Sequence, residues 1–238
     1  MKLHILTLFP GIIEGYFSSS IAARAVKEKI LDVNIVNIRD FAEDKHRTCD
    51  DYPYGGGPGM ILKPEPLAGA LDSVQGMKKR VIYPTPSGRL FNQKEASGLS
   101  VEEEIVFICG RYEGVDQRII DLYVDDELSI GDYVISSGEI AVLVIIDAIY
   151  RLITGVINSE SLKEESFSLG LLEYPQYTRP HCFKDISVPE VLVSGHHENI
   201  QKWRIGKSLE KTKKNRPELL SDLSNIMKED GGIEDGPY

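Results

Sequence analysis

Cysteine is scarce in this chain, and its pattern excludes the common cysteine-based frameworks. Only Cys49, Cys109 and Cys182 occur among 238 residues; they are odd in number, widely separated and form no CxxC pair. This spacing argues against a disulfide scaffold or a structural zinc site, and it fits a reducing compartment. We therefore expect a cytoplasmic protein.

The chain also lacks a long apolar run that is free of charge. Its longest apolar segment, residues 140–157, contains Asp147 and Arg151, and side chains four residues apart meet on one face of a helix. An internal ion pair favours a core helix over a membrane span, so no membrane partner is expected. The apolar run at residues 3–9 stops at Pro10 without a convincing cleavage site, which predicts a first buried strand rather than a signal peptide.

Two familiar phosphate-binding motifs are missing as well. No segment matches GxGxxG, and the glycine-rich residues 55–60 lack the Lys-Ser/Thr pair of a P-loop. A dinucleotide or nucleoside triphosphate site is therefore unsupported. Internal repeats and low-complexity segments are also absent from the sequence.

A net charge of −10 disfavours nucleic acid as a partner, but the total hides a division along the chain. Residues 176–216 contain nine Lys and Arg against four Asp and Glu, whereas residues 217–238 contain one basic and six acidic residues. A local basic face matters more than the net charge when the partner is polyanionic. A solvated charged helix explains the same feature equally well at this point.

The rest of the sequence alternates strands and helices. Strands are predicted at the N-terminus and at residues 33–38, 80–83 and 104–109. Helices are predicted from a cap at residues 18–20 to residue 30, and at residues 64–74, 93–99, 115–122 and 140–157; a polar, glycine-rich loop covers residues 44–59. This alternation predicts an α/β fold with a mostly parallel sheet covered by helices on both faces.

The composition changes past Gly155. Residues 158–168 are polar and lack a clear period, which indicates a mobile linker, and the chain beyond them has a helical pattern. We predict a first domain at residues 1–158, a flexible linker at residues 159–171 and a smaller helical domain at residues 172–238.

Three loops are candidates for a ligand site: residues 83–88, 109–114 and 129–139. In a parallel α/β sheet, ligands bind outside the carboxyl ends of the strands. Glycine in such loops lets backbone groups approach a ligand closely, because it has no Cβ. An ordinary turn is the commoner explanation of each loop taken alone, but their joint placement favours one compact pocket.

Several longer motifs carry a resemblance to a known family. They are DKHRT at residues 44–48, DD at 50–51, PYGGGPGM at 53–60, CGRYEG at 109–114, SIGDYV at 129–134, YTRP at 177–180 and SGHH at 194–197. Together they resemble the bacterial tRNA (guanine-N1)-methyltransferase family of the trefoil-knotted (SPOUT) superfamily, over nearly the whole chain. The resemblance implies a deep C-terminal knot in the α/β domain, a helical tRNA-binding domain, and a homodimer whose active site is completed by the partner chain.

The resemblance also implies S-adenosylmethionine as the cofactor, held in a bent shape by the three loops. The cofactor contacts that it implies are Tyr83, Pro84, Thr85, Gly110, Tyr112, Ile130, Gly131, Asp132, Tyr133, Val134, Ile135 and Gly138. The family is thought to use Mg²⁺, but the sequence shows no dedicated ligand cluster. His196 and His197 lack a third ligand at a suitable spacing.

The implied substrate is the guanosine immediately 3′ of the anticodon in tRNA. Its N1 carries a proton at neutral pH, so methyl transfer needs a base near N1 and a cation near O6. By resemblance the base is Glu165, the cation is Arg151, and Glu113 lies near the reacting centre. Without the family, Arg151 is better explained as the partner of Asp147 and Glu165 as solvated surface.

Four positions depart from the family pattern. Glu165 replaces an aspartate in a linker one residue shorter, and we expect its longer side chain to compensate. Glu173 replaces a second aspartate, which contacts a nucleobase. Ser136 and Ser137 replace Thr-Gly, which costs about 1 kcal/mol if Ser137 needs a positive φ.

Contacts to tRNA follow from the resemblance and from the basic segment. They are Asp50, Gly59, Glu173, Arg179, Lys202, Arg204, Lys207, Lys211 and Lys214. Lysine and arginine there meet phosphates, which position the substrate without reading its sequence. Two alternatives stay open: a knotted methyltransferase acting on rRNA or on ribose, and a non-catalytic RNA-binding protein.

Overall fold

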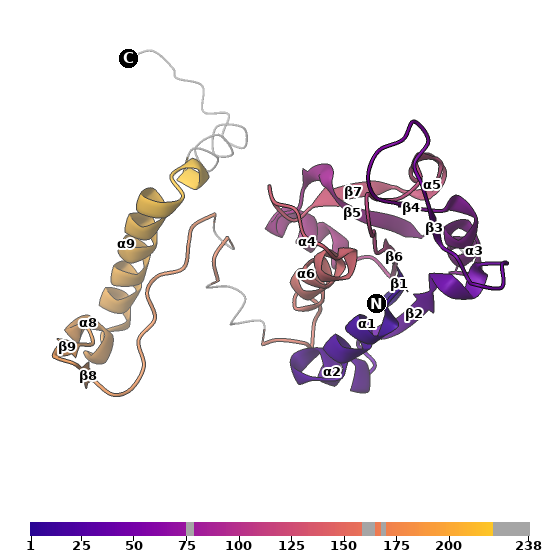
Figure 1. The fold of residues 1–238 in the computed structure, drawn as a ribbon. Coiled ribbons are helices and arrows are strands. Elements are labelled where there is room, and N and C mark those ends of the chain that lie inside the picture. Colours follow the sequence, from indigo (N-terminus) through magenta and orange to yellow (C-terminus); the bar gives the residue numbers. More distant parts are fainter. Residues whose placement is uncertain (75–78, 159–164, 168–169, 221–238) are drawn as a thin grey trace, which may run out of the picture. The chain divides into compact units, whose positions relative to one another are not determined.

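A computed structural model of the protein describes residues 1–74, 79–158, 165–167 and 170–220 (Figure 1). The chain divides into two compact units, Met1–Ile157 and Asn158–Tyr238. The first unit contains the central sheet and its helices, and the second contains the long helix α9 (His197–Asn215).

The first unit is built on a five-stranded sheet. Its strands follow one another in the order β2 (Asp32–Asn37), β1 (Lys2–Thr7), β6 (Glu104–Ile108), β5 (Arg80–Leu90) and β7 (Asp126–Ser129). All four neighbouring pairs run parallel. The strands β1 and β6 are buried along most of their length, as parallel strands covered on both faces are. The predicted α/β fold with a mostly parallel sheet is confirmed.

Helices cover both faces of this sheet (Figure 1). Ile5 and Phe107 pack into one apolar cluster, and their chain neighbours Leu6 and Ile108 pack into the other, because successive side chains of a strand point to opposite faces. The first cluster contains residues of α1 (Pro10–Phe17), α2 (Ser20–Lys27), α4 (Gln93–Leu99) and α6 (Gly138–Tyr150). The second contains residues of η1 (Ile38–Phe41), α3 (Pro64–Val74) and α5 (Gln117–Tyr123).

Several predicted bounds were wrong. The strand predicted at residues 80–83 continues as β5 to Leu90, with a register shift between Pro84 and Arg89, so residues 83–88 are strand and not a turn. The helix predicted to residue 157 ends at Tyr150. The helix α1 was missed because Pro10-Gly11 was taken as a stop, whereas proline at the start of a helix loses no hydrogen bond.

The strand β7 was also missed, because its acidic residues are poor strand formers. The structure shows how it is tolerated. Asp126 pairs with Arg89 at 2.7 Å and with Arg80 at 2.5 Å, so both guanidinium groups neutralise it. A strand that looks too acidic in the sequence is therefore stable at the edge of this sheet.

A short antiparallel ribbon interrupts the long polar loop. It pairs β3 (Asp50–Asp51) with β4 (Ile61–Leu62) and so closes a glycine-rich loop over residues 52–60. Leu62 donates its N–H to the carbonyl of Gly114 at 3.0 Å, and Glu113 donates to the carbonyl of Met60 at 2.9 Å. These bonds fasten the base of the loop to the segment that follows β6.

The second unit contains a hairpin of β8 (Cys182–Phe183) and β9 (Ile186–Ser187), the short helix α8 (Glu190–Val193) and α9. Thr212 of α9 is fully buried and accepts the N–H of Leu172 at 2.9 Å. The helix ends just before Arg216-Pro217. Most of the predicted linker lies outside the described residues. No described helix is both long and apolar enough to cross a membrane.

Candidate functional site

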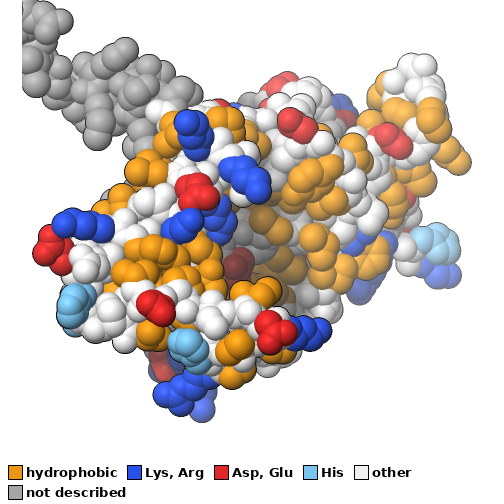
Figure 2. Space-filling view, turned by 90° about the vertical axis from the view of Figure 1, so that its left-hand side faces the viewer, with side chains coloured by type: hydrophobic (Ala, Val, Ile, Leu, Met, Phe, Trp, Pro, Cys, Tyr) orange, Lys and Arg blue, Asp and Glu red, His pale blue; other side chains and the backbone are white. Residues whose placement is uncertain are grey.

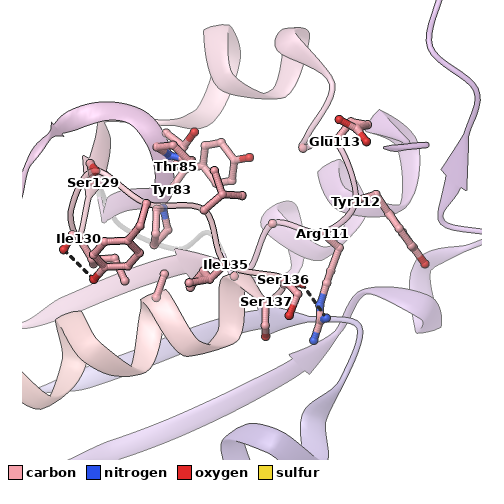
Figure 3. Close-up of a pocket in the computed structure, with 18 of the residues that line it drawn as sticks. Tyr83, Thr85, Arg111, Tyr112, Glu113, Ser129, Ile130, Ile135, Ser136 and Ser137 are labelled. Carbon is pink, nitrogen blue, oxygen red and sulfur yellow. Dashed lines mark hydrogen bonds between the residues drawn. The ribbon is translucent and has the colours of Figure 1, made fainter. Parts of the chain in front are cut away.

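A pocket of about 720 Å³ lies where β6 and β7 end, beside the irregular middle part of β5 (Figure 3). Its walls come from residues 83–86, 110–114, 128–131 and 133–138, with Phe9, Gly59, Met60 and Ala141 completing them. The three segments chosen from the sequence therefore line one cavity, although the first of them is strand and only the other two follow the carboxyl ends of strands, where α/β sheets bind ligands.

Eleven of the twelve predicted cofactor residues line this pocket. They are Tyr83, Pro84, Thr85, Gly110, Tyr112, Ile130, Gly131, Tyr133, Val134, Ile135 and Gly138. Asp132 is not among the residues that line it. The pocket also takes in Gly59, predicted as a tRNA contact, and Glu113, predicted near the reacting centre.

Glycine at two positions lets the loops touch. Gly138 donates its N–H to the carbonyl of Gly110 at 3.0 Å, and a Cβ on Gly138 would lie 2.4 Å from backbone atoms of Gly110. A Cβ on Gly110 would in turn lie 2.9 Å from the ring of Tyr83. Any side chain at these positions would separate the loops and reshape the pocket.

Ser137 does not carry the strain that its position suggested. Its φ is −142°, which is extended backbone, so the condition for a cost at this position, a positive φ, is not met. The side chain instead donates to Oε2 of Glu139 at 2.8 Å. Serine is thus accommodated at this position through a hydrogen bond to a buried carboxylate.

That carboxylate is the centre of a polar cluster beside the pocket. Glu139 is 0% exposed, accepts from Thr7 Oγ1 at 2.6 Å and pairs with Nη2 of Arg111 at 2.8 Å. Arg111 also donates to the carbonyl of Ser136 at 3.1 Å (Figure 3). Its guanidinium lies 4.3 Å from the ring centre of Phe9. Sequence reasoning missed this cluster, although Arg111 stands within the CGRYEG motif.

Two neighbouring side chains are held in their neutral forms. Burial raises the pKa of the Cys109 thiol well above its ordinary value, and the charge of Glu139 adds to the effect. Burial also raises the pKa of the Tyr83 phenol, with a smaller contribution from Glu127. Both groups stay protonated at neutral pH, so neither supplies an anionic nucleophile at this site.

Gly59 and Glu113 are adjacent. Gly59 has a φ of +85°, and a Cβ built on it would lie 2.4 Å from Oε1 of Glu113. The predicted substrate contact and the predicted acidic residue therefore share one edge of the pocket. Asp50, another predicted tRNA contact, lies in β3 at the base of the same loop.

Arg151 is not brought to the pocket of its own chain. The pocket lies at the beginning of α6, whereas Arg151 caps the end of that helix. Thirteen residues separate the two ends, or roughly 20 Å at the rise of an α-helix. Asp147, the suggested partner of Arg151, accepts hydrogen bonds from Tyr150 at 2.9 Å and from Tyr16.

The other predicted residues belong to the second unit. Glu165 precedes Ser166, whose hydroxyl accepts the N–H of Glu173 at 3.0 Å, and Lys211 donates to the carbonyl of Glu173 at 3.0 Å. Arg204 lies 4.7 Å above the ring of Tyr174. Arg179 comes just before a cis proline, and Lys214 lies in the last turn of α9.

Lys202 and Lys207 form ion pairs on α9 itself. Lys202 pairs with Glu198 at 2.7 Å and Lys207 with Glu210 at 2.6 Å. The lysine of the second pair has its pKa raised by its hydrogen bond to Glu210. Exposed pairs of this kind are weak, so both lysines can exchange their partner for a phosphate.

A parallel α/β sheet with a pocket at the carboxyl ends of its strands is the arrangement in which α/β proteins typically bind small molecules. Comparison with known proteins identifies the family to which the chain belongs. A family described as tRNA (Guanine-1)-methyltransferase TrmD matches residues 1–222. The chain belongs to this family, and it is a methyltransferase.

Individual relatives agree. The tRNA (guanine-N(1)-)-methyltransferase of Treponema denticola is 65% identical over 225 residues, which cover 94% of this chain and 93% of that protein. The protein of the same name from Treponema pallidum is 62% identical, covering 93% and 88% of the two chains. That of Borreliella burgdorferi is 58% identical, covering 98% and 99%. The family resemblance drawn from the motifs is confirmed.

Proposed function

We propose that this chain transfers the methyl group of S-adenosylmethionine to N1 of the guanosine immediately 3′ of the anticodon in tRNA. The observation that carries the proposal is that one pocket, in a member of this family, collects eleven of the twelve predicted cofactor residues. The same pocket has Glu113 and Gly59 on its edge.

The pocket suits S-adenosylmethionine chemically. Gly110, Gly131 and Gly138 expose backbone to a ligand, while Pro84, Ile130 and Ile135 provide apolar walls for a nucleoside. When bound, the cofactor supplies an electrophilic methyl group on a sulfonium. We propose that the three loops form the trefoil knot of the superfamily, and the bond between Gly138 and Gly110 supports their close packing.

The residues of the chain have to activate the guanine. In the proposed reaction Glu165 takes the proton from N1, and Arg151 stabilises the charge that develops at O6. Glu113 lies at the pocket edge, where it helps to hold the reacting groups in line. No covalent intermediate is needed, so correct placement is the main requirement.

We propose a homodimer in which Arg151 serves the pocket of the partner. The separation of roughly 20 Å along α6 supports this, because it keeps Arg151 away from its own pocket. Apolar side chains exposed near the beginning of α6 support it as well: Val134 is 85% exposed, Ile140 46% and Val144 45%. Exposed apolar side chains of this kind are typical of interaction surfaces.

The proposed tRNA contacts divide between the two units. In the first unit, Tyr52 is 78% exposed and Tyr54 is 100% exposed, on the loop that ends at Gly59. Aromatic rings so placed can stack on nucleobases. In the second unit, the basic residues of α9 meet phosphates. On the face that Figure 2 shows, Lys and Arg side chains are interspersed with acidic and apolar ones.

The domain assignment is part of the same proposal. It comprises a knotted cofactor domain at residues 1–158, a linker at 159–171 and a tRNA-binding domain at 172–238, in a cytoplasmic protein. The resemblance also implies Mg²⁺. Among the described residues no group of three or more His, Cys, Asp or Glu side chains fits a metal ion.

Mass spectrometry of the modified nucleoside tests the proposal. Purified protein is incubated with S-adenosylmethionine and unmodified tRNA, and the product nucleosides are identified after digestion. N1-methylguanosine at the predicted position is expected, and replacing the target guanosine by adenosine should abolish it. A ribose-methylated product, or methylation of rRNA only, would favour the other knotted enzymes. Cofactor binding without any product would favour a non-catalytic RNA-binding protein.

A further inference from the structure

A buried charge beside the pocket has no part in the reaction proposed above. Glu139 is the second residue of α6 and is fully buried, and it pairs with Arg111, which lines the pocket. Burying an ion pair is costly, and replacing one by apolar side chains is often neutral or stabilising. Because this ion pair is costly and lies at the pocket wall, we infer that its charges have a role in ligand binding and not only in stability.

The pair joins all three segments that meet there. The N–H of Phe9 donates to Thr7 Oγ1 at 2.9 Å, and this hydroxyl donates to Oε1 of Glu139 at 2.6 Å. On the other oxygen, Glu139 holds Ser137 and Arg111, each at 2.8 Å. The carboxylate thus links the end of β1, the loop after β6 and the loop that enters α6.

Arg111 is the positively charged member of this ion pair. Its side chain is 17% exposed, and its Nε has no hydrogen-bond partner among the described protein atoms. Its neutralisation therefore depends on Glu139, since the remaining contacts are a carbonyl and the ring of Phe9. Without the carboxylate, the pocket wall would carry an unbalanced positive charge on a side chain that is largely buried.

We propose that Glu139 is a positioning residue that keeps the pocket wall electrically balanced for a cationic cofactor. This inference rests on the proposed use of S-adenosylmethionine, whose sulfonium is positive. Glu139 cancels the charge of Arg111 and holds the three segments in register. Loss of its charge then weakens binding of the sulfonium more than binding of the same molecule without the positive charge.

S-adenosylhomocysteine provides that comparison, because it lacks the methyl group and its sulfur is neutral. Isothermal titration calorimetry on the full chain measures both affinities in four proteins: wild type, Glu139→Gln, Arg111→Met and the double variant. An unbalanced charge about 10 Å from a ligand charge changes affinity by about tenfold at an effective dielectric constant near 20. Glu139→Gln should weaken S-adenosylmethionine by about that factor relative to S-adenosylhomocysteine.

The other two variants test the direction of the change in the ratio of the two affinities. Arg111→Met leaves the negative charge and should not lower the preference for the sulfonium, and the double variant should restore the wild-type ratio. Val142→Ala is the control for packing, because Val142 is fully buried on the same helix and does not line the pocket. It should lower the unfolding temperature and leave the ratio of the two affinities unchanged.

The outcomes separate this inference from the function on which it rests. If the wild-type chain binds neither ligand, the proposed cofactor is wrong. If the wild type binds both but Glu139→Gln weakens them equally, Glu139 acts only through structure and the inference is overturned. The inference also fails if the double variant is as selective against the sulfonium as Glu139→Gln alone.

Discussion

The backbone of Gly138 lies against the backbone of Gly110, with the N–H of the first bonded to the carbonyl of the second at 3.0 Å. This contact joins the loop that enters α6 to the loop that follows β6. It leaves no room for a side chain, because a Cβ on Gly138 would fall 2.4 Å from both N and O of Gly110. The shape of the pocket therefore depends on a glycine whose side-chain position is filled by another loop.

Replacing Gly138 by alanine should damage the pocket. The backbone atoms that it meets cannot move aside as a flexible side chain can, so we expect a loss of about 1–3 kcal/mol in unfolding free energy and a much weaker cofactor affinity. Gly98→Ala is a matched control, since a Cβ there meets nothing within 4 Å and alanine favours its helix. Urea unfolding and calorimetric titration give both quantities. Unchanged cofactor binding in Gly138→Ala would contradict the role of this contact.

Tyr54 should contribute to tRNA binding and not to cofactor binding. Its ring is fully exposed on the loop that is fastened beside the pocket, and a stacked base is worth about 1–3 kcal/mol. Tyr54→Ala should therefore raise the KM for tRNA several-fold or more, while Tyr54→Phe, which keeps the ring, should resemble wild type. Steady-state methylation kinetics at saturating cofactor measure the effect. Equal KM values for wild type and Tyr54→Ala would show that the ring does not contribute to tRNA binding.

Much of this site could be predicted because its signals are local. Glycine-rich loops after strands point to a ligand edge, and the motifs at residues 109–114 and 129–134 name a family. The pairing of Glu139 with Thr7 could not be predicted, since the two residues are 132 positions apart and nothing local joins them. The sequence left the sign of φ at Ser137 open for a related reason. This sign depends on how the loop packs on Gly110 and Glu139, which composition does not encode.

The same dependence on contacts between distant residues explains why β7 and the position of Arg151 could not be predicted. An acidic strand is stable only because Arg80 and Arg89, far away in the sequence, neutralise Asp126. The distance of Arg151 from its own pocket follows from the length of α6, whose end the sequence placed seven residues too late. Local patterns identify elements and motifs, whereas the partners of charged groups emerge only from the tertiary structure.

His4 should make the stability of the first unit depend on pH. Its ring is 3% exposed, with Nδ1 at 2.9 Å from the amide of Asn34 and Nε2 at 3.3 Å from Lys79. Burial lowers its pKa below the ordinary value of 6.5, and the charges of Lys79 and Lys2 act in the same direction.

The sign of the dependence follows from proton binding. The unfolded chain takes up a proton at His4 more readily than the folded chain, so the stabilisation is present above the unfolded pKa and is lost as the pH falls below about 6.5. Urea unfolding between about pH 5 and pH 8 should show this decline in wild type. It should be smaller in His4→Gln, which keeps a polar group of similar reach. Parallel curves for the two proteins would exclude His4 as the source.

Glu165→Gln tests the proposed base. Glutamine keeps the size of the side chain but cannot take the N1 proton, so single-turnover methylation should fall by about 10²–10⁴-fold. Affinity for the cofactor and for tRNA should stay within about threefold of wild type. Glu164→Gln is the neighbouring control, with one charge removed at the adjacent position, and should methylate normally. Full activity of Glu165→Gln would show that another group accepts the proton.

Arg151 offers the most direct test of the shared active site. If Arg151 acts on the pocket of the partner chain, two inactive variants should complement each other when their subunits are mixed. Arg151→Ala has an intact pocket and no cation, whereas Gly138→Ala has the cation and a damaged pocket. In a mixed dimer, the intact pocket of the first meets the Arg151 of the second, and one working site is formed.

Random exchange makes half of the dimers mixed, each with one of its two sites working, so activity should recover to about a quarter of the wild-type value. The subunits are unfolded and refolded together to ensure exchange, and the separately refolded variants are the control. If Arg151 instead serves its own chain, no combination contains a working site, because every intact pocket is then paired with alanine. Activity that stays at the level of the separate variants would therefore place Arg151 outside a shared site, whatever the oligomeric state.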